Sequence, residues 1–440
     1  METVLLYVLG IVVVVVGLAV SIALHELGHL IPAKAFGVRV GQYMIGFGPT
    51  LWSRRRGETE YGVKAIPLGG YISMSGMYPP ARQGGKARTA STGFFQTLVQ
   101  DARETSATTV IEEERTFYQL PVWKRIIIML GGPFMNLLLA IVLFAIVLCG
   151  FGVQQVSTTI GTVSECVLPA TSERQECSPS DEEAPGAAAG LLPGDTIVSI
   201  DGTPIETWEQ SSAIIRESPG VPLAMVVERD GTDVEITAIP RLTERYVYDD
   251  DNVPVEGSDG ELLTEDVGML GITAAYELTR QPITAVLPTV GENIASVTNV
   301  ILHLPERIID VAEAAFGPEE RDPNGPISVV GVGRIAGEIT SIDTIPVVER
   351  ASYLIGLLAS VNVALMVFNL IPLMPLDGGH VVGALWEGIR RWFAKLFKRP
   401  DPGPVDTARL IPLTLVVVII LGGMSALLIY ADIVKPVTLL

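Results

Sequence analysis

The sequence predicts a multi-pass membrane protein with about four transmembrane α-helices, a β-hairpin region at one membrane face and an α+β domain beyond the other. Mean hydropathy is +0.43, and the apolar residues are concentrated in blocks instead of being spread evenly. Each block is near or above the length that crosses a hydrocarbon core of about 30 Å as a helix. The blocks cover residues 4–34, 125–152, 351–376 and 408–431.

The first block is expected to stay in the protein as a helix over residues 1–36. It opens METVLLYV without the Lys or Arg of a signal peptide, and it continues well past the apolar core of one. The other helices are expected at 121–153, 351–386 and 409–432, and the third of the four is interrupted by Asn and Pro.

The charge of the connecting segments predicts the topology. Residues 35–124 hold 11 Lys and Arg against 7 acidic residues, whereas 152–350 hold 10 Arg, no Lys and 35 acidic residues. Short basic loops stay in the cytoplasm, and long domains cross the membrane largely regardless of charge. We therefore expect 35–124 and the basic loop 387–408 inside, and 152–350 and both termini outside. The net charge of −19 argues against nucleic-acid binding.

Between the first two helices, residues 37–78 contain two short β-type runs on either side of RRRGETE. This pattern predicts a hairpin or small sheet associated with the cytoplasmic membrane face. Residues 79–120 are polar and are expected to form a cytoplasmic loop.

The outer segment begins with a β-rich pattern over residues 156–242, which predicts a compact α+β domain. Residues 243–350 are expected to form an acidic linker and amphipathic helices along the outer membrane surface. Cys166 and Cys177 lie in an outer loop, where the compartment allows a disulfide, although two free thiols are the alternative. Their spacing does not suggest a zinc site.

The motif HELGH at residues 25–29 interrupts the first apolar block. On a helix, His25 and His29 share one face and can bind one metal ion, while Glu26 can act as general base on a metal-activated water. The alternative is a set of polar residues buried in a helix bundle. Three ionisable residues in a membrane helix are costly, which favours a metal site.

A catalytic zinc needs a third protein ligand. Asp377 ends the third apolar block in NLIPLMPLDGGH and is expected at the same membrane depth as His29, so it is the favoured ligand. Its alternative role is a helix N-cap. For His380 a supporting or surface role is favoured over the alternative of a metal ligand. Asn362 and Asn369 share a helix face and are explained either by helix–helix hydrogen bonds or by contact with substrate.

These motifs resemble the site-2 protease family of intramembrane zinc proteases in its bacterial, PDZ-containing form. The resemblance rests on HELGH, IPLGGYISMSG (66–76), GGPFMN (131–136) and NLIPLMPLDGGH (369–380), and it covers most of the chain. GLLPGDTIVSIDG (190–202) looks like the core of a PDZ domain, so the outer domain is expected to be PDZ-like and to bind a peptide.

The resemblance implies a Zn²⁺ cofactor held by His25, His29 and Asp377, with Glu26 as general base. It also implies that the hairpin, at about residues 61–74, holds an unwound substrate by strand addition. The substrate-binding candidates are Pro67, Leu68, Gly69, Gly70, Asn369 and Asn362.

The expected activity is hydrolysis of a peptide bond in or near a transmembrane segment of a single-pass membrane protein, such as an anti-sigma factor or a remnant signal peptide. The expected location is the cell membrane, with the site near the cytoplasmic side of the bilayer. Two alternatives are a non-catalytic PDZ membrane scaffold and another membrane zinc hydrolase. The insert with both outer Cys, the long 79–120 loop and the acidic segment 247–266 depart from the family pattern and leave substrate choice open.

Overall fold

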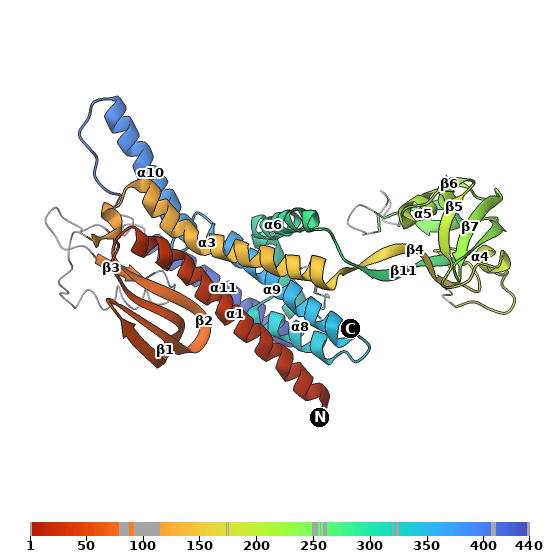
Figure 1. Cartoon of the computed structure of the whole chain (residues 1–440), viewed down its shortest axis with the longest axis horizontal. Helices are drawn as coiled ribbons and strands as arrows, with labels where there is room; N and C mark the ends of the chain where they lie inside the picture. The colour runs from red at the N-terminus through yellow and green to blue at the C-terminus, as the bar shows by residue number, and fades with distance from the viewer. Residues whose placement is uncertain are drawn as a thin grey trace. The chain divides into compact units, whose positions relative to one another are not determined.

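The computed structural model divides the chain into two compact units (Figure 1), which are described separately. One unit combines residues 1–151 with 281–440, and the other is Gly152–Arg280. The second unit continues well beyond the expected domain end at residue 242. The described residues are 2–78, 88–91, 115–172, 174, 176–248, 254–255, 257, 262–318, 321–322, 325–405 and 411–437. Most of the expected 79–120 loop and half of the acidic segment 247–266 lie outside them.

The first unit is a helical bundle with one sheet. Its α-helices are α1 (Glu2–Ala35), α3 (Val122–Ala145), α6 (Val286–Leu302), α7 (Leu304–Phe316), α8 (Val329–Ser341), α9 (Val347–Asn369), α10 (Asp377–Leu396) and α11 (Ile411–Val434). Short helical turns are η2 (Phe117–Gln119), the π-helical η3 (Ile146–Phe151), which extends α3, and η4 (Ile283–Ala285). Helix α1 packs against α3 and α8, and α3 packs against α9 and α10.

Five helices in the described residues are long and apolar enough to cross a membrane. Four of them overlap the predicted spans, but the third predicted helix, 351–386, is divided: its membrane-spanning part ends at Asn369 and a separate helix begins at Asp377. The fifth, Ile283–Leu302, falls in the segment that was expected to lie along the membrane surface. Its mean hydropathy of 1.2 is the lowest of the five, which explains why sequence alone favoured a surface helix.

The sheet of the first unit is built from β1 (Val40–Arg56), β2 (Thr59–Tyr78) and β3 (Arg88–Ser91), in that order. Strand β2 bends around β1, so residues 42–45 of β1 pair with 60–63 on one side and with 70–73 on the other. The sheet packs on the C-terminal part of α1 and on α3 through one apolar cluster. That cluster includes Leu30, Ala33, Val40, Ile72, Met74, Ile128 and Met129.

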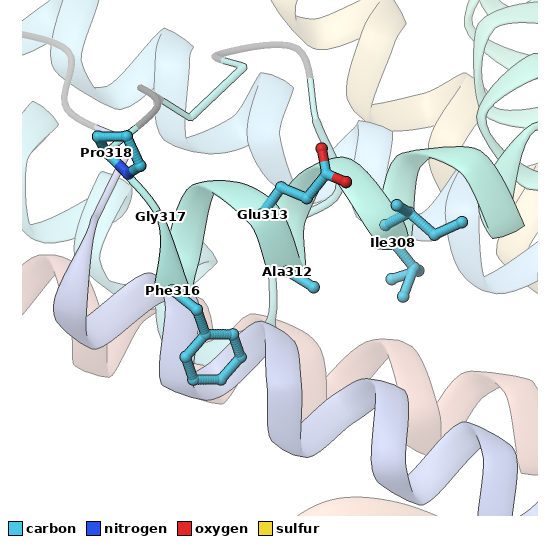
Figure 2. A pocket seen from close by; sticks show the side chains of 7 residues that line it. Ile308, Ala312, Glu313, Phe316, Gly317 and Pro318 are labelled. Carbon is cyan, nitrogen blue, oxygen red and sulfur yellow. The ribbon is translucent and has the colours of Figure 1, made fainter.

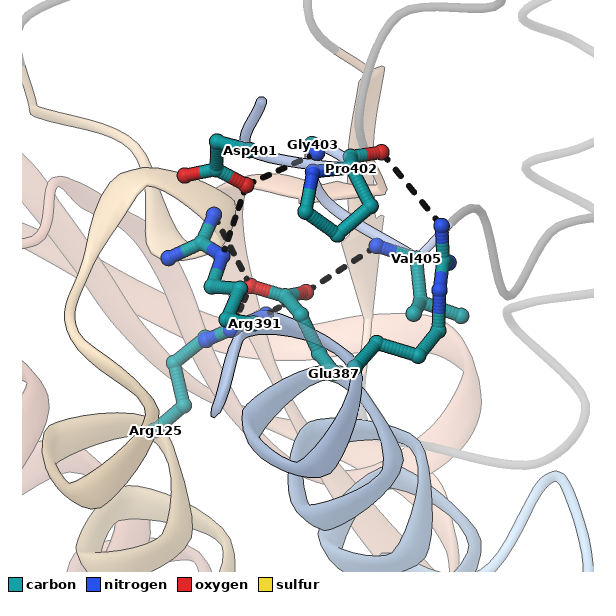
Figure 3. Close-up of polar contacts among 8 residues, drawn as sticks. Arg125, Glu387, Arg391, Asp401, Pro402, Gly403 and Val405 are labelled. Carbon is teal, nitrogen blue, oxygen red and sulfur yellow. Dashed lines mark hydrogen bonds and ion pairs between the residues drawn. The ribbon is translucent and has the colours of Figure 1, made fainter. Parts of the chain in front are cut away.

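A buried ion pair joins α3 to α10. Arg125 donates to both carboxylate oxygens of Glu387, with Nη1 and Nη2 at 3.0 and 2.5 Å, and Glu387 is fully buried. Figure 3 shows that Glu387 also accepts from the backbone N–H of Val405. A buried carboxylate is tolerated only when it is paired and hydrogen-bonded, so these contacts fix α10 against the start of α3.

Helix α7 carries an open, mainly apolar groove (Figure 2). Phe316 stacks on Tyr430 of α11, with ring centroids 5.1 Å apart. Among the described residues Glu313 is the one ionisable side chain in its lining, and no convergent polar groups of the kind that mark a catalytic pocket are found among them.

The second unit is an α+β fold. Its strands are β4 (Val153–Val163), β5 (Thr196–Ile200), β6 (Thr203–Pro204), β7 (Leu223–Arg229), β8 (Thr232–Ala238), β9 (Arg241–Tyr246), β10 (Thr264–Met269) and β11 (Ile272–Thr279). Its helices are α4 (Pro185–Ala188) and α5 (Trp208–Glu217). The main sheet has the order β11-β4-β5-β7-β8, and β9 and β10 form a separate ribbon. The last strand of the unit, β11, pairs antiparallel with its first strand, β4.

Cys166 and Cys177 form a disulfide in this unit. The bridge closes the loop that precedes α4, so these two cysteines are paired and not free thiols. Cys149, in the π-helical end of α3, is a free thiol.

Asp195 is a buried carboxylate in the turn before β5. It accepts 2.7 Å hydrogen bonds from Nε and Nη2 of Arg229 and one of 2.8 Å from the N–H of Leu192. The bonds from Arg229 hold the pKa of Asp195 below its usual value. Asp195 therefore stabilises the unit above its unfolded pKa of about 3.9, and this stability is lost as pH falls through the lower folded-state pKa.

Replacing Asp195 with Asn should lower the local free energy of opening of β5 and β7 by about 1–3 kcal/mol at neutral pH, because Arg229 loses its charged partner. Hydrogen exchange of these strands in the full chain would measure the change. Asp233→Asn, at an exposed position in β8, is the matched control. Equal exchange in both variants would contradict the assignment.

Candidate metal centre

Helix α1 places the HELGH side chains inside the first unit. His25 and His29 are 9% and 0% exposed, and Glu26 is 5% exposed. The Nε2 atoms of His25 and His29 lie 3.2 Å apart, as expected for residues one turn apart on the same helix face.

Asp377 reaches the same point from the other end of the chain. Its Oδ2 lies 3.3 Å from Nε2 of His25 and 3.3 Å from Nε2 of His29. Asp377 is the first residue of α10, after the turn that follows α9. Gly378 and Gly379 let this turn pack on the helix start, since an added Cβ would lie 2.3 Å from the Leu370 carbonyl oxygen or 2.7 Å from the Met374 nitrogen.

The three donor atoms fit a zinc ion. Their separations of 3.2–3.3 Å match the edge of a tetrahedron with arms of about 2.0 Å, which is about 3.3 Å. Two imidazoles and one carboxylate are ordinary zinc ligands, and three protein ligands is the number found in catalytic sites. His25, His29 and Asp377 are also the one group of this kind in the described residues whose ligand atoms converge.

The second ring nitrogen of His29 has a defined role. Nδ1 lies 2.7 Å from the carbonyl oxygen of Ile128 in α3. A carbonyl can only accept, so Nδ1 carries the proton and donates it. The lone pair of Nε2 then faces His25 and Asp377, which is the tautomer that a metal ligand requires.

Helix α3 approaches the ligands closely because it has glycines there. A Cβ at Gly132 would lie 2.3 Å from Nε2 of His29 and 2.7 Å from Nε2 of His25. Gly131 of α3 and Gly28 of α1 bring these two helices together. An added Cβ at either glycine would lie 2.0–2.1 Å from the carbonyl oxygen of the other. None of these three glycines was predicted individually from the sequence, because their role depends on the packing of two distant helices.

The hairpin region reaches Glu26. A Cβ at Gly70 would lie 2.9 Å from Cγ of Glu26. Tyr43 of β1 donates from its hydroxyl to the carbonyl oxygen of Ala23, at 2.7 Å. Burial raises the pKa of Tyr43 to about 12, and the charge of Glu26 acts in the same direction. The side chain of Glu26, the general-base candidate, therefore lies on the side of α1 that faces the sheet.

The remaining substrate-binding candidates are placed differently. Asn362 is fully buried, and its Nδ2 donates to Ser21 Oγ of α1 at 2.9 Å and to the Leu358 carbonyl at 2.7 Å. Asn369 is half-buried at the end of α9, where it donates to the Leu365 carbonyl. Gly69 has a φ of +128°. Pro67 and Leu68 lie in β2, but their side chains are outside the described part of the chain.

Asn136 was not selected as a site residue from the sequence. It lies one turn after Gly132 on α3 and is 1% exposed. Neither of its polar side-chain atoms has a hydrogen-bond partner in the described structure. A buried amide without partners is unusual and indicates a place where a water molecule or a ligand group belongs. In the sequence, the available signal was a single polar residue in the otherwise apolar run 126–152.

Apolar helices of membrane-spanning length, an HExxH motif and a converging aspartate together define a membrane metalloprotease. The comparisons agree with this class. The model of Peptidase family M50 matches residues 13–399. The chain therefore belongs to peptidase family M50, the site-2 proteases, and is a zinc metalloprotease.

Similar proteins match over nearly the full length. Zinc metalloprotease Rip1 of Mycobacterium tuberculosis is 33% identical over 446 residues, covering 99% of this chain and all of the relative. Rip1 of Mycolicibacterium smegmatis is 33% identical, with 98% of each chain covered. Metalloprotease MmpA of Caulobacter vibrioides is 30% identical, with 85% of each covered.

Proposed function

We propose that this enzyme hydrolyses a peptide bond within or next to the transmembrane segment of a single-pass membrane protein. The observation that carries the proposal is the meeting of His25, His29 and Asp377 inside a bundle of helices long enough to span a membrane. Ionisable groups are placed in such helices for a function, and three converging metal ligands supply one.

Each residue has a chemical role in this proposal. His25, His29 and Asp377 hold the zinc ion, which, when bound, lowers the pKa of a water molecule and polarises a carbonyl group. Glu26 accepts the proton of the attacking water and returns it to the amide nitrogen that leaves. The Ile128 carbonyl keeps the proton of His29 on Nδ1, so that the ligand atom stays available.

The sheet presents the substrate as an extended strand. A peptide bond inside a helix is hydrogen-bonded and sterically closed, so the substrate must unwind before water can attack. Residues 61–63 of β2 pair on both sides, with 43–45 and 52–54. This leaves 66–72 as the part of the expected 61–74 edge that can add a strand. Gly70 places that edge beside Glu26.

The polar residues near this edge support the same role to different degrees. Asn369 lies at the end of α9, eight residues before Asp377, and is the better candidate for holding the substrate backbone. The amide N–H groups of Asn362 already bond to Ser21 and to its own helix, which favours a helix–helix contact for this residue.

The second unit acts as a PDZ-like domain outside the cell membrane. Its core contains the GLLPGDTIVSIDG turn and strand, and its acidic composition fits the predicted outer location. In this topology both termini are outside and the metal centre lies near the cytoplasmic side. The domain either binds a peptide or excludes substrates that have bulky outer parts. Anti-sigma factors before a first cleavage and intact preproteins are substrates of this kind.

Removal of the metal tests the proposal. Purified protein in detergent should cleave a model single-pass substrate inside its apolar segment, and treatment with a chelator should abolish cleavage. Adding Zn²⁺ back should restore it, because the three ligands remain in place. Mass spectrometry of the products locates the cut. Cleavage only outside the apolar segment, or cleavage that survives zinc loss, would contradict the proposed function. Hydrolysis of lipid with no peptide cleavage would favour another membrane hydrolase.

A further inference from the structure

The C-terminal half of α10 has an aromatic and apolar face that no described part of the chain covers. Six large side chains on it are 47–64% exposed: Trp386, Ile389, Trp392, Phe393, Leu396 and Phe397. Their spacing of three and four residues places them along one side of the helix. Aromatic residues at this density are typical of helices that lie at a membrane–water interface.

This half of α10, together with the residues that follow it up to Asp401, carries an excess of positive charge. The acidic residues of the segment are already engaged, since Glu387 pairs with Arg125 and Arg391, and Asp401 lies 3.5 Å from Arg391 Nε. Four cations remain without an ion pair among the described residues: Arg390, Lys395, Lys398 and Arg399.

The chain after α10 folds back and forms a groove. Val405 donates its N–H to Glu387 at 3.0 Å, and Arg390 Nη2 donates to the Pro402 carbonyl at 3.4 Å (Figure 3). Pro400 and Pro402 are thereby held beside the aromatic face. The groove is lined by Trp386, Ile389, Phe393 and Phe397, together with Arg390, Arg399 and the two prolines.

We propose that this groove binds an anionic phospholipid. The acyl chain would lie on Trp386, Phe393 and Phe397, and the phosphate would be held by Arg390 and Arg399. A guanidinium group binds phosphate through paired hydrogen bonds, and basic residues near an anionic membrane surface attract it.

A lipid is favoured over a soluble partner because of where the groove lies in the chain. Helix α9, which is apolar and long enough to span a membrane, ends at Asn369, and α10 begins eight residues later. Glu387, next to Trp386 of the groove, pairs with Arg125 in the first turn of the apolar span Val122–Phe151, so the groove is close to a membrane boundary. Asp377 lies at the other end of the same helix, so a lipid held here would anchor the helix that supplies this side chain to the metal centre. The proposal does not depend on the protease activity.

The test compares lipid binding by full-length variants. The protein would be reconstituted in nanodiscs of phosphatidylcholine with or without phosphatidylglycerol, released into mild detergent, and analysed for retained lipid by native mass spectrometry. Wild type should retain phosphatidylglycerol in preference to phosphatidylcholine. Arg390→Gln with Arg399→Gln should weaken this about 30-fold, since each basic side chain near the surface contributes roughly fivefold.

Two matched controls separate the causes. Arg390→Lys with Arg399→Lys keeps both charges but loses the paired hydrogen bonds of the guanidinium groups, so its retention should lie between that of wild type and that of the Gln variant. Phe393→Ala removes a groove wall and should weaken retention, whereas Leu385→Ala, at an exposed position of α10 outside the groove lining, should not. If the double Gln variant misfolds, Phe393→Ala and loss of retention with rising salt in wild type test the proposal instead.

Equal retention of both lipids by wild type would overturn the proposal. Full phosphatidylglycerol retention by the double Gln variant would also overturn it, and so would a Lys variant as weak as the Gln variant. If a soluble protein occupied the groove instead, wild type would retain both lipids equally.

Discussion

Glu26→Gln is expected to keep the zinc ion and to lose cleavage by a factor of about 10²–10⁴, the usual contribution of a general base. Glutamine has almost the same shape as glutamate but cannot accept a proton from water. Glu26 is not one of the three converging ligand residues, so zinc content should stay near one per chain. Metal analysis of the purified variant and cleavage of a single-pass substrate would be measured on the same sample.

Glu292→Gln is the matched control, because it makes the same change at an exposed position of α6. It should match wild type in both measurements. If Glu26→Gln cleaved within a few-fold of wild type, another group would have to be the base. If it lost zinc, Glu26 would have a structural role at the metal centre. Either result would contradict the assigned role.

The helical part of the fold could be predicted because membrane helices follow from local composition. Long apolar runs predicted the positions of α1, α3 and α11 directly, whereas the third predicted helix, 351–386, joined α9 to the first half of α10. The extent of the second unit could not be predicted this way. It depends on the pairing of β11 with β4, which are separated by more than a hundred residues that include the acidic segment. Non-local strand pairing leaves little signal in a single sequence.

In the candidate site too, residues with a local sequence pattern could be predicted and residues that depend on tertiary packing could not. His25, His29 and Glu26 follow from helix periodicity within five residues, and Asp377 follows from membrane depth once a third ligand is required. The contribution of Ile128 is a backbone carbonyl, which no side-chain motif can reveal. The close approach of Gly132 and the unpartnered amide of Asn136 depend on how α3 packs on α1. Tertiary contacts, not local pattern, decide these positions.

Asp377→Ala is expected to lose both zinc and cleavage. The substitution removes one of three ligands and leaves two imidazoles, which cannot complete the site. Loss of residues that only support a metal ligand weakens metal binding by 10–100-fold, so loss of a ligand itself should cost at least about 100-fold. Zinc affinity measured by competition with a chromogenic chelator would report this independently of activity.

The position of Asp377 at the start of α10 requires a second comparison. An acidic residue in the first turn stabilises a helix by about 0.3–1 kcal/mol, so some stability would be lost without any metal effect. Asp377→Asn separates the two causes, because it keeps a hydrogen-bonding side chain at the helix start but provides a far weaker ligand. It should lose zinc like the Ala variant while retaining more thermal stability. Asp310→Ala, an exposed position in α7, should retain zinc and activity. Full zinc occupancy in Asp377→Ala would show that the third ligand is another residue, since two imidazoles alone do not form a catalytic zinc site.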